Sequence, residues 1–206
     1  PYLDWLGLSI DASNDGMHFS MGRGTKGEIK SGISRHLERS KRVWRMAQRL
    51  GYGLKLNTVV TSVNAHDDMS ELVKTLRPHR WKIFRVLRII GENDGRVEPL
   101  LISPNHFDDY MTRHRRCLQD FKEINIVAED NEDMLGTYAM IDPQGRAYTN
   151  KNRRYLYSKK SCVEVGFSDA WNEVVSGFSE DRFENRGGEW DWKRQVPIHL
   201  PVLEMK

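Results

Sequence analysis

The sequence is poor in the residues that build disulfide frameworks and metal centres. It contains two cysteines, Cys117 and Cys162, which lie 45 positions apart without a pairing pattern. Two such thiols predict a reduced, cytoplasmic (intracellular) protein rather than a secreted disulfide scaffold. The histidines show no metal-ligand spacing, since His106 and His114 are eight positions apart rather than one helical turn. This spacing argues against a zinc enzyme.

Long apolar runs and a strong net charge are also absent. No stretch approaches the roughly 18 apolar residues of a membrane span, so we expect no membrane segment in this chain. The formal net charge of +3 permits acidic ligands but does not predict DNA binding. The chain has no initiator methionine and opens at Pro1 inside a strand-like run. We therefore expect the C-terminal part of a longer protein, with any N-terminal membrane anchor outside this chain.

The chain does contain a regular alternation of strand-like and helix-like segments. Strand patterns occur at residues 2–11, 55–61, 80–90 and 124–127, and helical patterns at 29–50, 67–76, 105–118 and 168–175. Residues 138–148 read as a hairpin, and the acidic residues 129–133 as a solvated turn. This order predicts one α/β domain with a parallel sheet.

Two of the predicted strands carry cations among apolar residues. Lys55 shares a strand face with Asn57, and Arg80 shares one with Lys82, because residues two apart point the same way. Parallel strands are normally buried on both faces, where an unpaired charge costs several kcal/mol. Neither strand offers a matching carboxylate, so we expect an anionic ligand, a polyphosphate. The alternative is a polar face that meets solvent, which is the commoner explanation in antiparallel sheets.

Two further features have ordinary explanations. Gly22-Arg23-Gly24-Thr25-Lys26-Gly27 lacks the Gly-Lys-Ser/Thr ending of a phosphate-binding loop, so its composition predicts only a flexible loop. The helical pattern at 29–50 has a basic face, for which a solvated outer surface is the expected role rather than RNA or membrane contact.

A series of motifs in consistent order resembles viperin and viperin-like radical SAM nucleotide dehydratases. The most specific block is residues 78–84, which contains Arg80-Trp81-Lys82. The resemblance spans residues 1 to 192 through these further motifs: residues 8–13, Gly22-Arg23-Gly24, residues 55–60, Asp67-Asp68-Met69, Gly91-Glu92-Asn93, Leu101-Ile102-Ser103, residues 138–142, Val165-Gly166, Ser176-Gly177-Phe178 and Arg186-Gly187-Gly188.

The resemblance implies a partial TIM-type (βα) barrel of the radical SAM superfamily. A complete eight-fold barrel needs about 250 residues. Residues 1–95 would form the C-terminal half of the partial barrel. Residues 96–206 would form a C-terminal extension that closes over the nucleotide site as part of one continuous unit.

The resemblance also assigns roles to individual residues. The triphosphate of a ribonucleotide would be bound by Lys55, Arg80, Lys82, Arg154 and Arg186, with Arg186 as a γ-phosphate clamp. S-adenosylmethionine (SAM) would be contacted by Ser9 and Arg23, and Asn57 would orient SAM or the nucleotide sugar where the two meet. Tyr138 would face the substrate, where its phenol could supply a proton or position the ribose.

The implied activity is that of a radical SAM lyase. It would convert CTP or UTP into the 3′-deoxy-3′,4′-didehydro nucleotide, an antiviral chain terminator, with SAM and a [4Fe-4S] cluster as cofactors. The Cys-x3-Cys-x2-Cys loop that holds such a cluster is absent here and would precede Pro1. Iron-sulfur assembly machinery and an electron donor would be further partners. The alternative is a non-catalytic basic module that binds nucleotides or RNA.

Overall fold

Four parallel strands form the central sheet of the protein. A computed structural model describes residues 3–189, in which β1 (Trp5–Ser9), β2 (Gly53–Val60), β3 (Arg80–Arg85) and β4 (Asn125–Glu129) pair in this order. Every pairing is parallel. The predicted α/β class with a parallel sheet is thus confirmed. Tyr2, where the first strand was expected to start, and residues 190–206 of the predicted extension lie outside the described residues.

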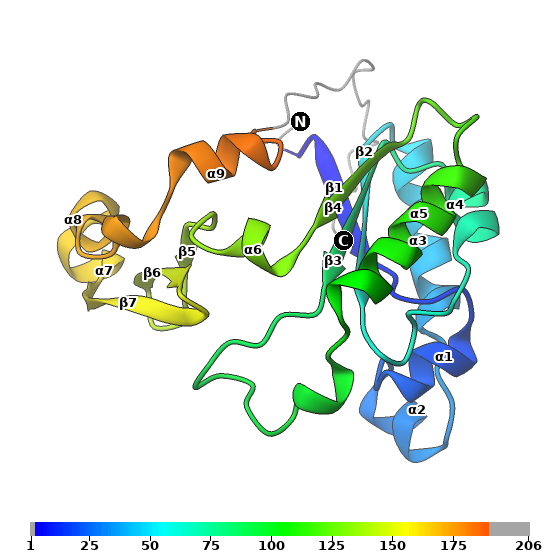
Figure 1. Cartoon of the computed structure of the whole chain (residues 1–206), viewed down its shortest axis with the longest axis horizontal. Coiled ribbons are helices and arrows are strands. Elements are labelled where there is room, and N and C mark those ends of the chain that lie inside the picture. Colours follow the sequence, from blue (N-terminus) through cyan, green and yellow to red (C-terminus); the bar gives the residue numbers. More distant parts are fainter. Residues whose placement is uncertain (1–2, 190–206) are drawn as a thin grey trace, which may run out of the picture.

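One layer of helices covers one face of this sheet (Figure 1). The connections contain α3 (His36–Arg49), α4 (Ser70–Leu76) and α5 (Pro104–Cys117). Strands that pair in sequence order through right-handed crossovers place their helices on the same side. The buried core confirms this, because apolar residues of all three helices share one cluster with Leu54, Leu56, Trp81 and Ile83 of β2 and β3.

The ends of several elements differ from the prediction. The helix expected over residues 29–50 is interrupted, because α2 (Lys26–Lys30) ends before Gly32, whose φ of 70° is left-handed. Gly51 is left-handed, as expected after a helix end. The strand expected to continue to residue 90 ends at Arg85. Arg80 and Lys82 therefore lie in the first half of β3, and no extension carries them to its carboxyl end.

A smaller antiparallel sheet lies across from the helix layer (Figure 1). It consists of β5 (Met140–Ile141), β6 (Arg146–Lys151) and β7 (Arg154–Ser161), and the β5–β6 hairpin confirms the turn expected near residues 143–145. The remaining helices are α1 (Asp15–Ser20), α6 (Asn131–Met134), α7 (Cys162–Val165), α8 (Phe167–Asn172) and α9 (Glu180–Asn185), with 3-10 turns η1 (Glu98–Leu100) and η2 (Val175–Gly177). Since β4 pairs with β3, the parallel sheet extends beyond the division predicted at residue 95.

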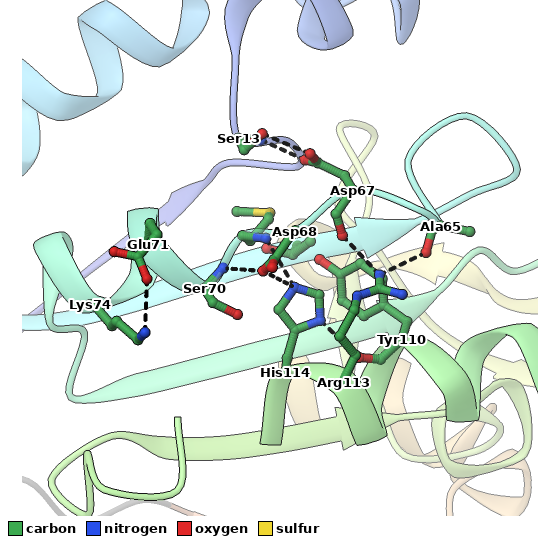
Figure 2. A network of polar contacts seen from close by, with 12 residues as sticks. Ser13, Ala65, Asp67, Asp68, Ser70, Glu71, Lys74, Tyr110, Arg113 and His114 are labelled. Carbon is green, nitrogen blue, oxygen red and sulfur yellow. Dashed lines mark hydrogen bonds and ion pairs between the residues drawn. The ribbon is translucent and has the colours of Figure 1, made fainter. Parts of the chain in front are cut away.

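A polar network fastens α5 to the loops that follow β1 and β2 (Figure 2). The Asp67 carboxylate accepts hydrogen bonds from the backbone N–H and the hydroxyl of Ser13, at 2.6 and 2.7 Å. Arg113 on α5 donates to the carbonyl oxygens of Ala65 and Asp67, at 3.0 and 2.8 Å. These bonds fix the carboxyl-terminal edge of the sheet.

Two negative expectations from the sequence concern the described residues. None of the helices formed by residues 3–189 has the length and apolar character needed to cross a bilayer. Cys117 and Cys162 are both free thiols.

Candidate anion-binding site

The predicted cations lie together on the face of the sheet opposite to the helices. Lys55 pairs with Arg80 and Asn57 pairs with Lys82 across β2 and β3, so the four side chains form two adjacent rows. Arg80 and Lys82 are only 6% and 9% exposed, and Lys55 is half-buried. The alternation in the sequence therefore predicted the shared face correctly, and these side chains are not spread into bulk solvent.

These four side chains line a cavity of about 460 Å³. Its volume lies within the range of about 300–1,000 Å³ that small-molecule sites occupy. Gly7 of β1 also lines it, and a Cβ at that position would lie in ordinary van der Waals contact with Cε of Lys55, at 3.6 Å, and with Nδ2 of Asn57, at 3.7 Å. The other lining residues are Trp5, Tyr138, Phe183, Arg186 and Gly188.

The C-terminal part of the chain supplies the opposite wall. Arg186 follows α9, and its side chain is 9% exposed. Its guanidinium donates to the carbonyl oxygen of Thr137 at 2.8 Å and lies 4.2 Å from the ring centroid of Tyr138. Arg186 and Tyr138 thereby join the strand cations across a long interval of sequence, and their roles as substrate contacts stay predictions.

Glu129 is the residue that sequence analysis missed. It was assigned to a solvated acidic turn, which is wrong, because it is the last residue of β4 and has no exposed surface. Its carboxylate forms ion pairs with Lys82 and with Arg186, the latter at 2.8 Å, and accepts a hydrogen bond from the Tyr138 hydroxyl at 2.6 Å. The expectation of cations without a matching carboxylate is thus corrected. The strand pattern in the sequence ended at Val127, two residues before Glu129. It therefore did not show that Glu129 lies on the same strand face as Val127.

Positive charge nevertheless exceeds negative charge in this group of described residues. Lys55, Arg80, Lys82 and Arg186 against Glu129 give four formal positive charges and one negative, a balance of +3. Burial lowers the pKa of Lys82 although Glu129 opposes the shift. Burial and the neighbouring Arg80 lower the pKa of Lys55. Depressed lysine pKa values mark a site where an additional anion would be stabilising.

The Glu129 carboxyl group is deprotonated, whereas the Tyr138 hydroxyl is protonated. Burial alone would raise the pKa of Glu129, but hydrogen bonds from Lys82 and Tyr138 outweigh burial and hold it below its usual range. Burial and the bond to Glu129 raise the pKa of Tyr138 far above that of a free phenol. The carboxylate is therefore ionised, and the phenol keeps its proton.

Of the predicted cofactor residues, Asn57 lines the cavity and Ser9 lies next to Asn57 in the sheet. Ser9 pairs with Asn57 across β1 and β2, and the Ser9 side chain is exposed. The Oδ1 atom of Asn57 is buried without a hydrogen-bond partner among the described residues. Asn57 thus offers an acceptor between the cation cluster and Ser9.

Arg23 lies apart from the other cations. Its Nε donates to the buried carboxylate of Asp11 at 2.7 Å, and both residues line a second cavity of about 340 Å³ with Val59 and Val86. That cavity lies near the carboxyl ends of β1, β2 and β3. The structure therefore separates the predicted SAM contact from the predicted phosphate contacts along the strand direction.

The structure does not bring Arg154 to the cavity. It begins β7 as an exposed residue, and its charge helps to lower the pKa of Asp94 in the loop after β3. Its role as a phosphate ligand stays a prediction. Residues 3–189 also contain no group of three or more His, Cys, Asp or Glu that could hold a metal ion.

Fold and site together define an α/β protein with a cationic cavity on the face of its parallel sheet opposite to the helices. No protein-family model matches the chain. The chain is 38% identical over 194 residues to an S-adenosylmethionine-dependent nucleotide dehydratase of Flammeovirga pacifica, a match that covers 93% of the chain and 61% of that protein.

Two further relatives carry the same name. The protein of Lacinutrix mariniflava is 32% identical over 192 residues, which cover 93% of the chain and 37% of the relative. The dehydratase RSAD2 of Oncorhynchus mykiss is 32% identical over 200 residues, or 94% of the chain and 53% of the relative. Over nearly all of its length the chain is similar to these viperin-like proteins, and it spans 37% to 61% of the length of these three relatives.

Proposed function

We propose that the protein containing this chain is a radical SAM lyase that dehydrates a pyrimidine ribonucleoside triphosphate. The product would be the 3′-deoxy-3′,4′-didehydro analogue of CTP or UTP, an antiviral chain terminator. The observation that carries this proposal is the cavity beside β2 and β3 with its excess of positive charge. The names of the relatives, which are SAM-dependent nucleotide dehydratases, point to the same chemistry.

The triphosphate is the part of the substrate that the cavity suits best. Ammonium and guanidinium groups bind phosphate oxygens through charge-assisted hydrogen bonds, and arginine can bind them in a bidentate manner. Lys55, Arg80 and Lys82 would bind from the sheet, and Arg186 from the opposite wall. Tyr138 would act as a neutral phenol toward the ribose, because its proton is firmly held.

SAM would occupy the carboxyl-terminal side of the same sheet face. Arg23 would bind its carboxylate with the part of the guanidinium that Asp11 leaves free, and Ser9 and Asn57 would contact it where it meets the nucleotide. Bound together with a [4Fe-4S] cluster, SAM supplies hydrogen-atom abstraction. The residues described here offer no ligands for that cluster, so none of its bonds is assigned to this chain.

The barrel assignment belongs to the same proposal. A sheet with strands in sequence order and helices on one face only is the arrangement found in each part of a (βα) barrel. Residues 1–95 would belong to the C-terminal half of a partial barrel, to which β4 adds a further parallel strand, and the rest of residues 96–206 would form the extension that covers it. An electron donor, iron-sulfur assembly machinery and a cytoplasmic location would follow from the need to assemble and reduce a cluster.

The activity is tested on the full-length protein, reconstituted anaerobically with iron and sulfide. It is incubated with SAM, a reductant and each of the four ribonucleoside triphosphates. We expect 5′-deoxyadenosine and a dehydrated nucleotide chiefly with CTP or UTP. Equal SAM cleavage with every nucleotide and no dehydrated product would contradict the proposal.

A second candidate is a non-catalytic basic module that binds nucleotides or RNA, favoured by the cations that line the cavity. It predicts tight binding of a nucleoside triphosphate to the reconstituted protein with no SAM cleavage under the same conditions. The two candidates therefore differ in one measured product, 5′-deoxyadenosine.

A further inference from the structure

We propose that Glu129 is an internal counter-ion of the anion-binding cavity, with which an incoming phosphate group competes for Arg186 and Lys82. This inference rests on the proposed phosphate site and assigns a role to a residue that lay outside it. It identifies Glu129 as a positioning residue, because its contacts are to other site residues.

The Glu129 carboxylate contacts a lysine, an arginine and a tyrosine of the cavity. One carboxylate oxygen, Oε1, receives both Arg186, at 2.8 Å, and the ammonium of Lys82. The other oxygen, Oε2, receives the Tyr138 hydroxyl at 2.6 Å. Arg186 also approaches that hydroxyl, at 3.2 Å. An anionic oxygen bound by an ammonium and a guanidinium has the same kind of partners that a phosphate oxygen would have.

Glu129 lies next to Lys82 along the strand direction. Glu129 ends β4 opposite Phe84, in the row of the sheet just beyond Lys82, so Lys82 reaches along the strand direction to meet it. Lys55 and Arg80 lie in the row on the other side of Lys82. Lys82 is therefore placed between an internal carboxylate and the remaining cations. A phosphate bound by Lys55 and Arg80 would draw Lys82 away from Glu129.

Glu129 also connects the sheet to the covering segment, the C-terminal part of the chain that forms the opposite wall of the cavity and contains Arg186. Arg186 is held to the sheet by Glu129 and to its own wall by the Thr137 carbonyl at 2.8 Å. Glu129 thus joins the two walls of the cavity. Its negative charge stabilises the cations in the free protein and opposes a second anion nearby.

The test is whether one substitution strengthens or weakens the binding of tripolyphosphate. We expect Glu129→Gln to bind inorganic tripolyphosphate about tenfold more tightly than the wild type in calorimetry, because a repelling charge is lost while the shape is kept. The matched control is Glu132→Gln, three residues after Glu129 in the sequence. It removes an exposed carboxylate that pairs with Arg153. The control should bind as the wild type does.

Each outcome separates the inference from the proposed function. If the wild type does not bind tripolyphosphate, the proposed phosphate site fails. If it binds and Glu129→Gln binds equally or more weakly, or if Glu132→Gln tightens binding as much, only the role of Glu129 is overturned.

A thermal readout keeps the inference testable if Glu129→Gln folds poorly. Without its internal counter-ion, the variant should gain more thermal stability from tripolyphosphate than the wild type gains, since the ligand replaces the missing charge. A destabilised variant that gains no more than the wild type would overturn the inference.

Tyr138→Phe should change the affinity for tripolyphosphate in the opposite direction. It removes the hydrogen bond that partly neutralises Glu129, so binding should weaken two- to threefold, about the effect of a weak hydrogen bond. In the Glu129→Gln background this change should have no effect.

Discussion

Lys82 illustrates how the protein stabilises a single buried ammonium group. Its ammonium group is nearly enclosed, pairs with Glu129 and lies 5.6 Å from the ring centroid of Phe84. These partners do not fully offset burial, since the pKa of Lys82 remains lowered. An ammonium held in this state gains free energy from any anion that reaches it. Lys82 is therefore the side chain on which ligand affinity should depend most directly.

The first prediction concerns this ammonium group. Lys82→Ala should weaken the binding of a nucleoside triphosphate by about 1.5–3 kcal/mol, the range of hydrogen bonds to charged groups. Isothermal calorimetry on the full-length protein measures the change. The control is Lys74→Ala on α4, where the ammonium pairs with Glu71 outside the cavity. Equal affinities for the wild type and Lys82→Ala would remove Lys82 from the site.

The second prediction concerns the pH dependence of binding. Lys55 has a pKa below its ordinary 10.5, because of burial and of Arg80. A bound anion favours the protonated lysine, so affinity is fully present at low pH and is lost as pH rises through this lowered pKa. Tripolyphosphate binding should therefore begin to weaken at a lower pH than the ordinary lysine value of 10.5 would give.

Lys55→Arg provides the matched variant for this pH dependence. A guanidinium stays charged to a much higher pH, so the variant should lose much of the decline while retaining affinity near neutral pH. A wild-type affinity that stays constant, or a decline of the same size in Lys55→Arg, would contradict the assignment to Lys55.

At the scale of elements, alternation along β2 and β3 was enough to predict which side chains share a face. Lys55, Asn57, Arg80 and Lys82 follow directly from a period of two, and the parallel pairing follows from the helix between the strands. The end of β4 could not be placed in the same way, because Glu129 belongs to an acidic run that is typical of a turn. Only the pairing of Phe84 with Glu129 extends the strand that far.

The third prediction concerns the attachment of α5 to the sheet. Arg113→Met keeps the aliphatic part of the side chain but leaves the carbonyl oxygens of Ala65 and Asp67 without their charged donor. The free energy of unfolding should fall by about 1.5–3 kcal/mol, measured by urea denaturation. Arg116→Met, on the exposed side of the same helix, should change it by less than about 0.5 kcal/mol. Similar effects for both variants would show that the two carbonyl contacts add no stability.

At the scale of the whole molecule, the cavity depends on segments that are far apart in the sequence. Composition and periodicity do not predict that Arg186 meets Lys82, and in this chain only the family resemblance placed them together. The resemblance did not predict that Glu129 lies between them, because the contact depends on how the covering segment lies over β4. The rows of a sheet can therefore be derived from local pattern, whereas the wall opposite them requires tertiary structure.

The fourth prediction concerns the stability of the whole fold in mild acid. His18 and His114 are buried with the same pattern of contacts. In each, a backbone N–H donates to Nε2, from Asp11 or Met69, and Nδ1 lies within 2.9 Å of a backbone carbonyl oxygen. This pattern suits a neutral ring, and burial lowers the pKa of both histidines below 6.5. Protonation would direct an N–H group at a backbone N–H.

The sign of the pH effect follows from these lowered pKa values. Below pH 6.5 the unfolded chain takes up protons that the folded protein does not, so stability falls as pH falls, until the folded-state pKa values are reached. The loss should be at most about 1.4 kcal/mol per pH unit for each histidine. Urea denaturation at about pH 7.5 and pH 5.5 measures it, above the range where most carboxylates titrate. Burial also lowers the pKa of His79, which contributes with the same sign. His114→Gln should therefore remove only part of the difference, because one of three neutral rings is lost. A fold that is equally stable at both pH values would show that these rings titrate alike in the folded and unfolded chain.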